Sequence, residues 1–170
     1  MSKLGTFFSQ TNRFYLILSF LIVGFISACG GGDSEPSVTY TSVLSGANEV
    51  PAAVASNGSG TGTTTLVTST RVLSGSIQLS GLTASAAHIH QGSSGVNGPV
   101  IVTLADQGSG KWAVPAGTVL TEAQAAAFTT NGLYFNVHTT ANPSGEIRGQ
   151  IPSVALSTTP ASPSAPSTGY

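Results

Sequence analysis

Hydrophobic and polar residues alternate with a period of two along much of the chain. In the segment 86–91, for example, the apolar Ala87 and Ile89 alternate with His88 and His90. Successive side chains of a β-strand point to opposite faces, so this alternation predicts short strands with one apolar face each. Glycine-rich turns separate the candidates. We predict strands at 39–45, 60–68, 72–80, 86–91, 100–104, 133–139 and 146–151.

One segment has a helical pattern instead. Thr121 and Gln124 have the spacing of a capping box, and the run Ala-Ala-Ala-Phe that follows favours a helix. Asn131 and Gly132 then tolerate the left-handed backbone that ends many helices. Seven strands and one short helix predict an all-β fold, either an antiparallel β-sandwich or a flattened barrel.

The amino-terminal end has the pattern of an export signal. Lys3 and Arg13 precede an apolar stretch from Phe14 to Ile26, and small residues follow it up to Cys29. The apolar stretch is too short for a comfortable membrane span, and this order of features is typical of secretory signals. We therefore expect residues 1–28 to be a signal peptide.

The segment Ile26-Ser27-Ala28-Cys29 resembles the bacterial lipobox, whose cysteine is acylated on sulfur and becomes the first residue of the mature protein. An ordinary signal peptide with an accidental Cys29 is the alternative. Because Cys29 is the only cysteine, lipidation explains both its position and its lack of a partner. Gly30 resembles the outer-membrane sorting pattern. We expect a protein of the bacterial cell envelope, held at the outer membrane by its amino-terminal lipid.

Composition divides the remaining chain into three parts. Residues 29–37 read as a flexible tether, 38–151 as one folded domain, and 152–170 as a disordered tail of Pro, Ser, Ala and Thr. After Cys29 there are three basic side chains against six acidic ones. Such a chain has no basic patch, which argues against nucleic acid as a partner. The sequence specifies no protein or small-molecule partner.

The three histidines are the candidate metal ligands. His88 and His90 share one face of their strand, and Tyr134, Asn136 and His138 share one face of theirs. If the two strands are neighbours, the three imidazoles converge. Imidazoles bind copper or zinc at about 2.0 to 2.1 Å, so this set predicts a possible copper or zinc site.

A framework role for the same histidines stays open. Buried histidines often donate to backbone carbonyls, and the loop with Gly92, Gly95 and Gly98 needs such a partner. The nearby sequence shows no obvious carboxylate base, and the common enzyme motifs are missing. We therefore expect a non-enzymatic binding or structural module, with a metalloprotein as the alternative.

Glu146 and Arg148 alternate on one predicted strand, and their side chains share a face. The simplest interpretation is an ion pair on the sheet surface, with Glu49 as another partner for the arginine.

These segments together resemble the CHRD, or chordin, domain family, over nearly the whole folded unit. The resemblance implies an extracytoplasmic all-β module in which Glu49, Asn136, Glu146 and Arg148 belong to the structural motif. Antagonism of bone morphogenetic proteins, known for the animal protein that gives the family its name, is not implied, because the cysteine-rich modules are absent. The matching segments are LSGANEVP at 44–51, SGL at 80–82, AHIHQG at 87–92, GPV at 98–100, GLYFNVHT at 132–139 and PSGEIRGQ at 143–150.

A fainter likeness connects residues 75–90 with Cu/Zn superoxide dismutase, in which a His-x-His pair on a strand binds copper. That family uses further histidines and an aspartate to build a bridged copper and zinc pair, whereas this chain has only His138 to add. Dismutation is therefore not expected, and a mononuclear copper or zinc site remains the hypothesis.

Overall fold

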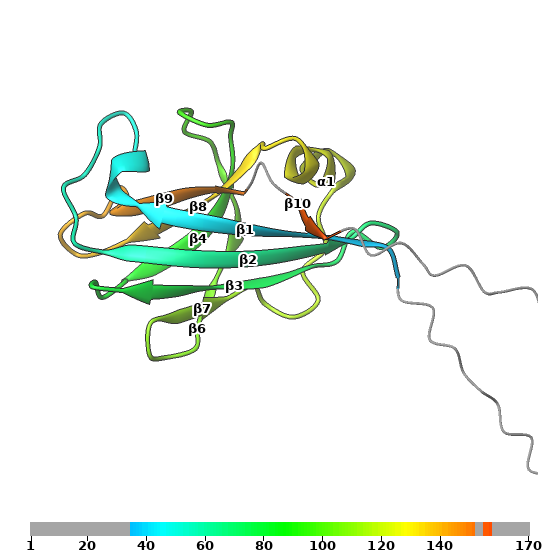
Figure 1. The fold of residues 1–170 in the computed structure, drawn as a ribbon, viewed down its shortest axis with the longest axis horizontal. Helices are drawn as coiled ribbons and strands as arrows, with labels where there is room; N and C mark the ends of the chain where they lie inside the picture. The colour runs from blue at the N-terminus through cyan, green and yellow to red at the C-terminus, as the bar shows by residue number, and fades with distance from the viewer. Residues whose placement is uncertain (1–34, 152–154, 158–170) are drawn as a thin grey trace, which may run out of the picture. The chain divides into compact units, whose positions relative to one another are not determined.

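The structure is a computed structural model that describes residues 35–151 and 155–157 (Figure 1). All seven expected strands are present within two residues of their expected bounds, and the predicted all-β class is confirmed. The elements are β1 (Ser37–Ser45), the 3-10 turn η1 (Gly46–Asn48), β2 (Ser59–Val67), β3 (Leu73–Ser80), β4 (Ala86–Gln91), β5 (Val100–Thr103), β6 (Ala105–Asp106), β7 (Lys111–Ala113), α1 (Glu122–Thr129), β8 (Leu133–His138), β9 (Ile147–Ile151) and β10 (Ala155–Ser157).

The strands form one antiparallel sheet that curls into a flattened barrel. Its order is β5-β4-β8-β9-β1-β2-β3-β7-β6, and β10 also pairs with β1. Strands β5 and β6 lie at opposite ends of this order, yet Leu104 alone separates them in the chain. The two ends of the sheet must therefore come together, and the barrel is nearly closed.

The apolar face of each strand points into the barrel, as the alternation predicts. Ile89, Phe135 and Ile147 of neighbouring strands have no exposed surface. Gly62 is required opposite Phe135, because a Cβ atom there would lie 2.6 Å from the phenylalanine ring. The capping box of α1 is confirmed, and Phe128 of this helix packs against Tyr40 with ring centroids 4.9 Å apart.

The outer face of β4, β8 and β9 is also covered, by the loop of residues 46–58 and the loop of residues 92–99. The first five residues of β8 are all buried, on both faces of the strand. Asn97 joins the two loops, because its side-chain amide donates to the Val50 carbonyl at 3.2 Å. The histidine-bearing face predicted from the sequence is therefore a second, polar layer beneath loops.

Strands β6, β7 and β10 were not expected from the sequence. Strand β6 has two residues and β7 has three, which is too short for an alternating pattern to be visible. Residues 155–157 pair with β1, which differs from the disorder expected throughout 152–170. Likewise β1 begins at Ser37, within the segment expected to be tether.

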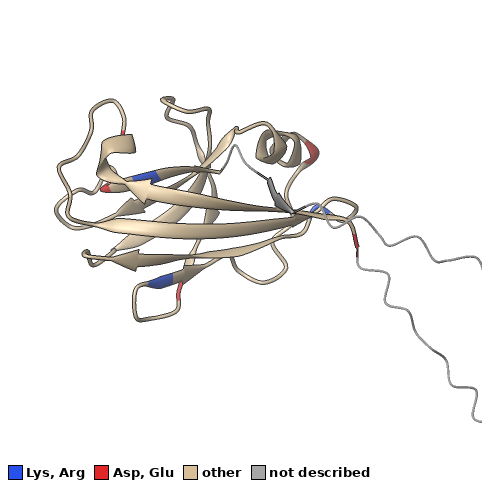
Figure 2. Cartoon of the chain, in the orientation of Figure 1, with Lys and Arg blue, Asp and Glu red and all other residues tan. Residues whose placement is uncertain are grey.

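The predictions for the amino-terminal end concern residues outside the described part of the chain. The expected signal peptide at 1–28, the lipidation site Cys29 and the tether up to residue 34 all lie there. Within residues 35–151 and 155–157, no helix has the length and apolar character needed to cross a membrane. Charged side chains on the described domain are few (Figure 2).

Candidate metal centre

Strand pairing brings the three histidines together. Strands β4 and β8 are neighbours, with His88 opposite Asn136, His90 opposite Tyr134 and Ala86 opposite His138. One ring nitrogen from each histidine lies within 4.8 Å of the others. The convergence expected from the alternation of side chains is therefore confirmed.

Backbone carbonyls determine which nitrogen of two of these rings is free. His90 Nδ1 lies 2.9 Å from the Gly98 carbonyl oxygen, and His138 Nδ1 lies 3.1 Å from that of Pro143. A carbonyl oxygen only accepts hydrogen bonds, so each Nδ1 carries the hydrogen and each Nε2 keeps a free lone pair. The predicted role of a histidine in fixing the glycine-rich loop is confirmed for His90.

The remaining nitrogens face one another. His88 Nδ1 lies 3.0 Å from His138 Nε2. Because the His138 atom has the lone pair, His88 Nδ1 carries the hydrogen between them. His90 Nε2 is buried and has no hydrogen-bond partner within the described part of the chain. Two nitrogens of the cluster, His90 Nε2 and His138 Nε2, thus have a lone pair. The third, His88 Nδ1, gains one if its hydrogen moves to Nε2 of the same ring.

The distances come close to those of a metal site. Three nitrogens bound to one ion at about 2.0 to 2.1 Å are roughly 3.3 to 3.6 Å apart, at tetrahedral to trigonal angles. The ring nitrogens of the cluster all lie within 4.8 Å of one another, so the imidazoles must approach by up to about 1.3 Å to bind one ion. After that approach the three residues could hold an ion in a three-coordinate imidazole site.

Partial burial favours the neutral form of two of the three histidines. It lowers the pKa of His88 and of His90 below 6.5, and the neighbouring histidines lower both pKa values further. For His90 the hydrogen bond with Gly98 opposes this shift, and Arg148 adds to it. Neutral imidazole is the form that binds metals, so proton competition is weak near neutral pH.

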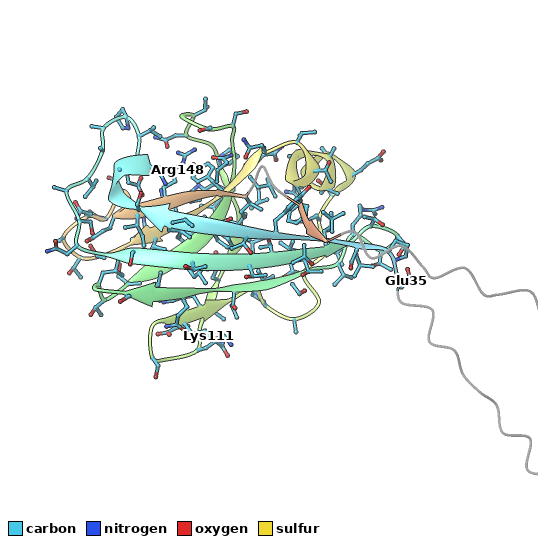
Figure 3. All side chains as sticks on the ribbon, viewed as in Figure 1. Glu35, Lys111 and Arg148 are labelled. Carbon is cyan, nitrogen blue, oxygen red and sulfur yellow. The ribbon has the colours of Figure 1, made fainter. Side chains whose placement is uncertain are left out.

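Arg148 lies on the same face of the sheet as His88, because both residues are register partners of Asn136, one on each side of β8. Arg148 is labelled in Figure 3. It is 2% exposed, and its Cζ atom lies 3.4 Å from the centre of the Tyr134 ring. The other neighbour of this ring is His90, which is nearly parallel to it at 13° with centroids 4.9 Å apart. The phenol ring of Tyr134 therefore contacts both the guanidinium group of Arg148 and the imidazole of His90.

The predicted surface ion pair between Glu146 and Arg148 is wrong. Glu146 precedes β9 and accepts hydrogen bonds from Ser56 at 2.6 Å, Thr139 at 2.5 Å and Asn142 at 3.0 Å, which lower its pKa. Arg148 instead donates to the loop of residues 92–99. Glu146 lies outside the strand on which the sequence placed both residues, and the sequence does not show that loops cover the face that carries Arg148.

Glu49 and Asn136 form a buried polar pair beside the centre. Glu49 is 6% exposed, and the Asn136 amide lies 3.5 Å from its carboxylate. Burial raises the Glu49 pKa, and Arg148 opposes this shift without forming a direct ion pair among the described residues. Glu49 also borders a polar cavity of about 580 Å³ that sequence reasoning missed, lined in part by Asn48, Asn131 and Gln150.

Two partners of the centre, the Tyr134 side chain and the Pro143 carbonyl, were not anticipated. Tyr134 was placed on the correct face but without a role, whereas its ring stacks on His90 and its hydroxyl accepts from the Gly98 amide at 3.0 Å. The spacing of Gly92, Gly95 and Gly98 was the one available signal for the loop. Nothing in the sequence indicated that the Pro143 carbonyl would hold His138.

Fold and site together define an all-β domain with a histidine cluster on its loop-covered outer face. The family model of the CHRD domain matches residues 40–151, which contain every residue of this cluster. The chain therefore belongs to the CHRD domain family. Searches of curated proteins and of solved structures gave no match.

Proposed function

We propose that this CHRD domain is a non-enzymatic binding module that holds one copper or zinc ion through His88, His90 and His138. The observation that carries the proposal is the His90 Nε2 atom, which is buried, has a free lone pair and lacks a partner among the described residues. A buried polar atom without a partner costs roughly 1 to 3 kcal/mol. A bound ion would remove this cost.

The choice of copper or zinc follows from the donors. All three are imidazole nitrogens, which suit these two metals, and the cluster contains no carboxylate or thiolate of the described residues. The hydrogen bonds from His90 to Gly98 and from His138 to Pro143 are the outer-shell contacts that usually orient metal-binding histidines. Membership of the CHRD family supports a non-enzymatic module.

Metal titration of the chain from Gly30 to Tyr170, made without a histidine tag, tests the proposal. Isothermal titration with Zn²⁺ and with Cu²⁺ should show one equivalent bound, and a variant with all three histidines changed to alanine should bind none. Asp106→Asn, which removes an exposed carboxylate, is the control for nonspecific binding and should leave the stoichiometry at one. Equal binding by the wild type and the triple variant would refute the proposal.

We further propose that the domain is presented at the cell envelope. The order of charged, apolar and small residues before Cys29 supports export and lipidation, and Gly30 supports the outer membrane. The membrane would then be a partner through the lipid, with a tether of Gly, Ser and Asp between them. An ion-binding domain at this position would meet metals outside the cytoplasm.

A further inference from the structure

The side chain of Tyr134 lies between two residues of very different chemistry. His90 of β4 is its register partner and stacks on it, whereas Arg148 comes from β9 on the other side of β8. The guanidinium carbon is 3.4 Å from the centre of the ring, which is a close cation–π contact. Any movement of Arg148 therefore changes what supports the ring beside His90.

Arg148 also holds the loop of residues 92–99. Its Nη1 donates to the Asn97 side chain at 3.0 Å, and its Nη2 donates to the carbonyls of Ser93 at 3.3 Å and Val96 at 2.8 Å. Gln150 adds a bond to the Gly92 carbonyl at 2.9 Å. The loop is thus fixed along its length by side chains of β9.

Gly98, near the end of this loop, makes the contact that orients His90. Gly98 receives the Nδ1 hydrogen of His90 on its carbonyl and donates its amide hydrogen to the Tyr134 hydroxyl. No side chain can replace the glycine, because a Cβ atom would lie 1.6 Å from the Gln91 carbonyl oxygen. The position of the loop therefore determines the orientation and tautomer of His90.

The burial of Arg148 makes this arrangement dependent on the arginine. A buried cation is strongly unfavourable unless it is paired or fully hydrogen-bonded. Among the described residues Arg148 has no ion-pair partner, and loop oxygens accept its hydrogens instead. The closed loop satisfies the guanidinium, and the guanidinium in turn keeps the loop closed.

We propose that Arg148 is a positioning residue of the three-histidine centre, which sets the His90 ring by closing the 92–99 loop and supporting Tyr134. The inference rests on the proposed metal binding. Arg148 does not touch the ion in this account. It prepares His90 so that the third ligand is already oriented when the ion arrives, and without it His88 and His138 would bind the ion alone.

Arg148→Lys is the principal test, because it keeps the charge and removes the planar fork and the flat contact with the ring. Loss of an outer-shell partner commonly weakens metal binding by about 10- to 100-fold, and we expect a loss in this range. Arg71→Lys is the matched control: Arg71 donates to Leu120, remote from the loop, and its replacement should not change the affinity. Phe128→Leu controls for a general loss of stability and should also leave affinity unchanged.

Nitrogen-15 shifts of the imidazoles in the metal-free protein provide a second readout that does not require a metal. The wild type should show His90 with hydrogen on Nδ1, and Arg148→Lys should give a mixture of tautomers while His138 keeps its own. If Arg148→Lys does not fold, Asn97→Ala removes one loop contact of the arginine and should shift the same readouts more weakly.

The outcomes separate the two proposals. Absence of metal binding by the wild type would refute the proposed function, whereas the tautomer of His90 would still test the role of Arg148. Wild-type affinity and an unchanged His90 tautomer in Arg148→Lys, or in Asn97→Ala if the former is unfolded, would overturn the inference and leave metal binding intact.

Discussion

His88 Nδ1 and His138 Nε2 lie 3.0 Å apart although 50 residues separate them in the chain. The carbonyl of Pro143 holds the other nitrogen of His138, so one hydrogen, on His88, occupies the space between the two rings. A metal ion would take the place of this hydrogen, and His88 would carry its hydrogen on Nε2 instead. Metal binding therefore requires a change of tautomer at His88, not a new arrangement of strands.

Single alanine variants of the histidines should separate metal binding from stability. We expect each variant to lose most of its metal affinity, since every ring contributes one ligand. His90→Ala should also reduce the unfolding free energy of the metal-free protein, because the Gly98 carbonyl loses its donor and Tyr134 loses its stacked ring, although the unpaired Nε2 atom is removed as well. Titration calorimetry and chemical denaturation of the same proteins measure both effects. Unchanged metal affinity in any of the three would contradict the site.

The stability of the metal-free protein should fall as the pH drops below about 6.5. The pKa values of His88 and His90 are lowered in the folded state, mainly by burial, so the unfolded chain binds more protons in this range. Urea denaturation between pH 7.5 and 5.5 measures the change. Burial raises the pKa of Glu49, so this residue makes the folded state more stable, relative to the unfolded state, as the pH falls. Glu49→Gln removes this opposing contribution, and the stability of the variant should therefore decline more steeply with falling pH. Stability that stays constant in that variant would show that the histidines are not depressed.

The pH dependence of metal affinity should reflect the same lowered pKa values. Because the pKa values of His88 and His90 in the folded protein are lowered below 6.5, Zn²⁺ affinity should decline at a lower pH than it does for histidines of ordinary pKa. Affinity measured across the same pH range provides the comparison, with an unstructured histidine-containing peptide as the reference. A midpoint at or above that of the peptide would be inconsistent with lowered pKa values at His88 and His90.

Glu146 should stabilise the fold through its three hydrogen bonds. Glu146→Gln keeps the shape but replaces one accepting oxygen and removes the charge, so we expect a loss of about 1 to 3 kcal/mol at pH 7. The pKa of Glu146 is lowered from 4.5, so its contribution is present above that pH and is lost as the pH falls through the lower folded value. Denaturation at pH 7 and at pH 3 should show a smaller difference between wild type and variant at the lower pH.

Cys29→Ser tests the proposed anchor. The substitution removes the sulfur that would carry the lipid, so we expect loss of fatty-acid labelling and release of the protein from bacterial membranes. Fractionation of cells that express both forms measures this, and Ser27→Thr provides a control with the cysteine intact. Retention of the serine variant in the membrane fraction would rule out anchoring through Cys29.

The alternation of residues predicted more of the site than of its surroundings. A period of two assigns faces to β4 and β8, and pairing of these strands was the one further condition for the histidines to meet. The capping box of α1 was equally local, because Thr121 and Gln124 are three residues apart. Features that depend on short sequence spacing were therefore predictable.

The role of Arg148 was not predictable in the same way. Its strand face was correct, but its partners lie more than 50 residues away in a loop whose path the sequence does not specify. An arginine that alternates with a glutamate favours a surface ion pair, and only the covering loop makes a buried guanidinium possible. The same loop buries Tyr134, so both faces of β8 are enclosed although only one is apolar.

The location of the bound ion tests the central claim most directly. Anomalous diffraction at the zinc or copper edge, from crystals of the metal-loaded domain, locates the ion without assumptions about affinity. We predict one site, within about 2.0 to 2.1 Å of His88 Nδ1, His90 Nε2 and His138 Nε2. An ion that binds elsewhere on the domain, or crystals grown with excess metal that show none between these three nitrogens, would contradict the account.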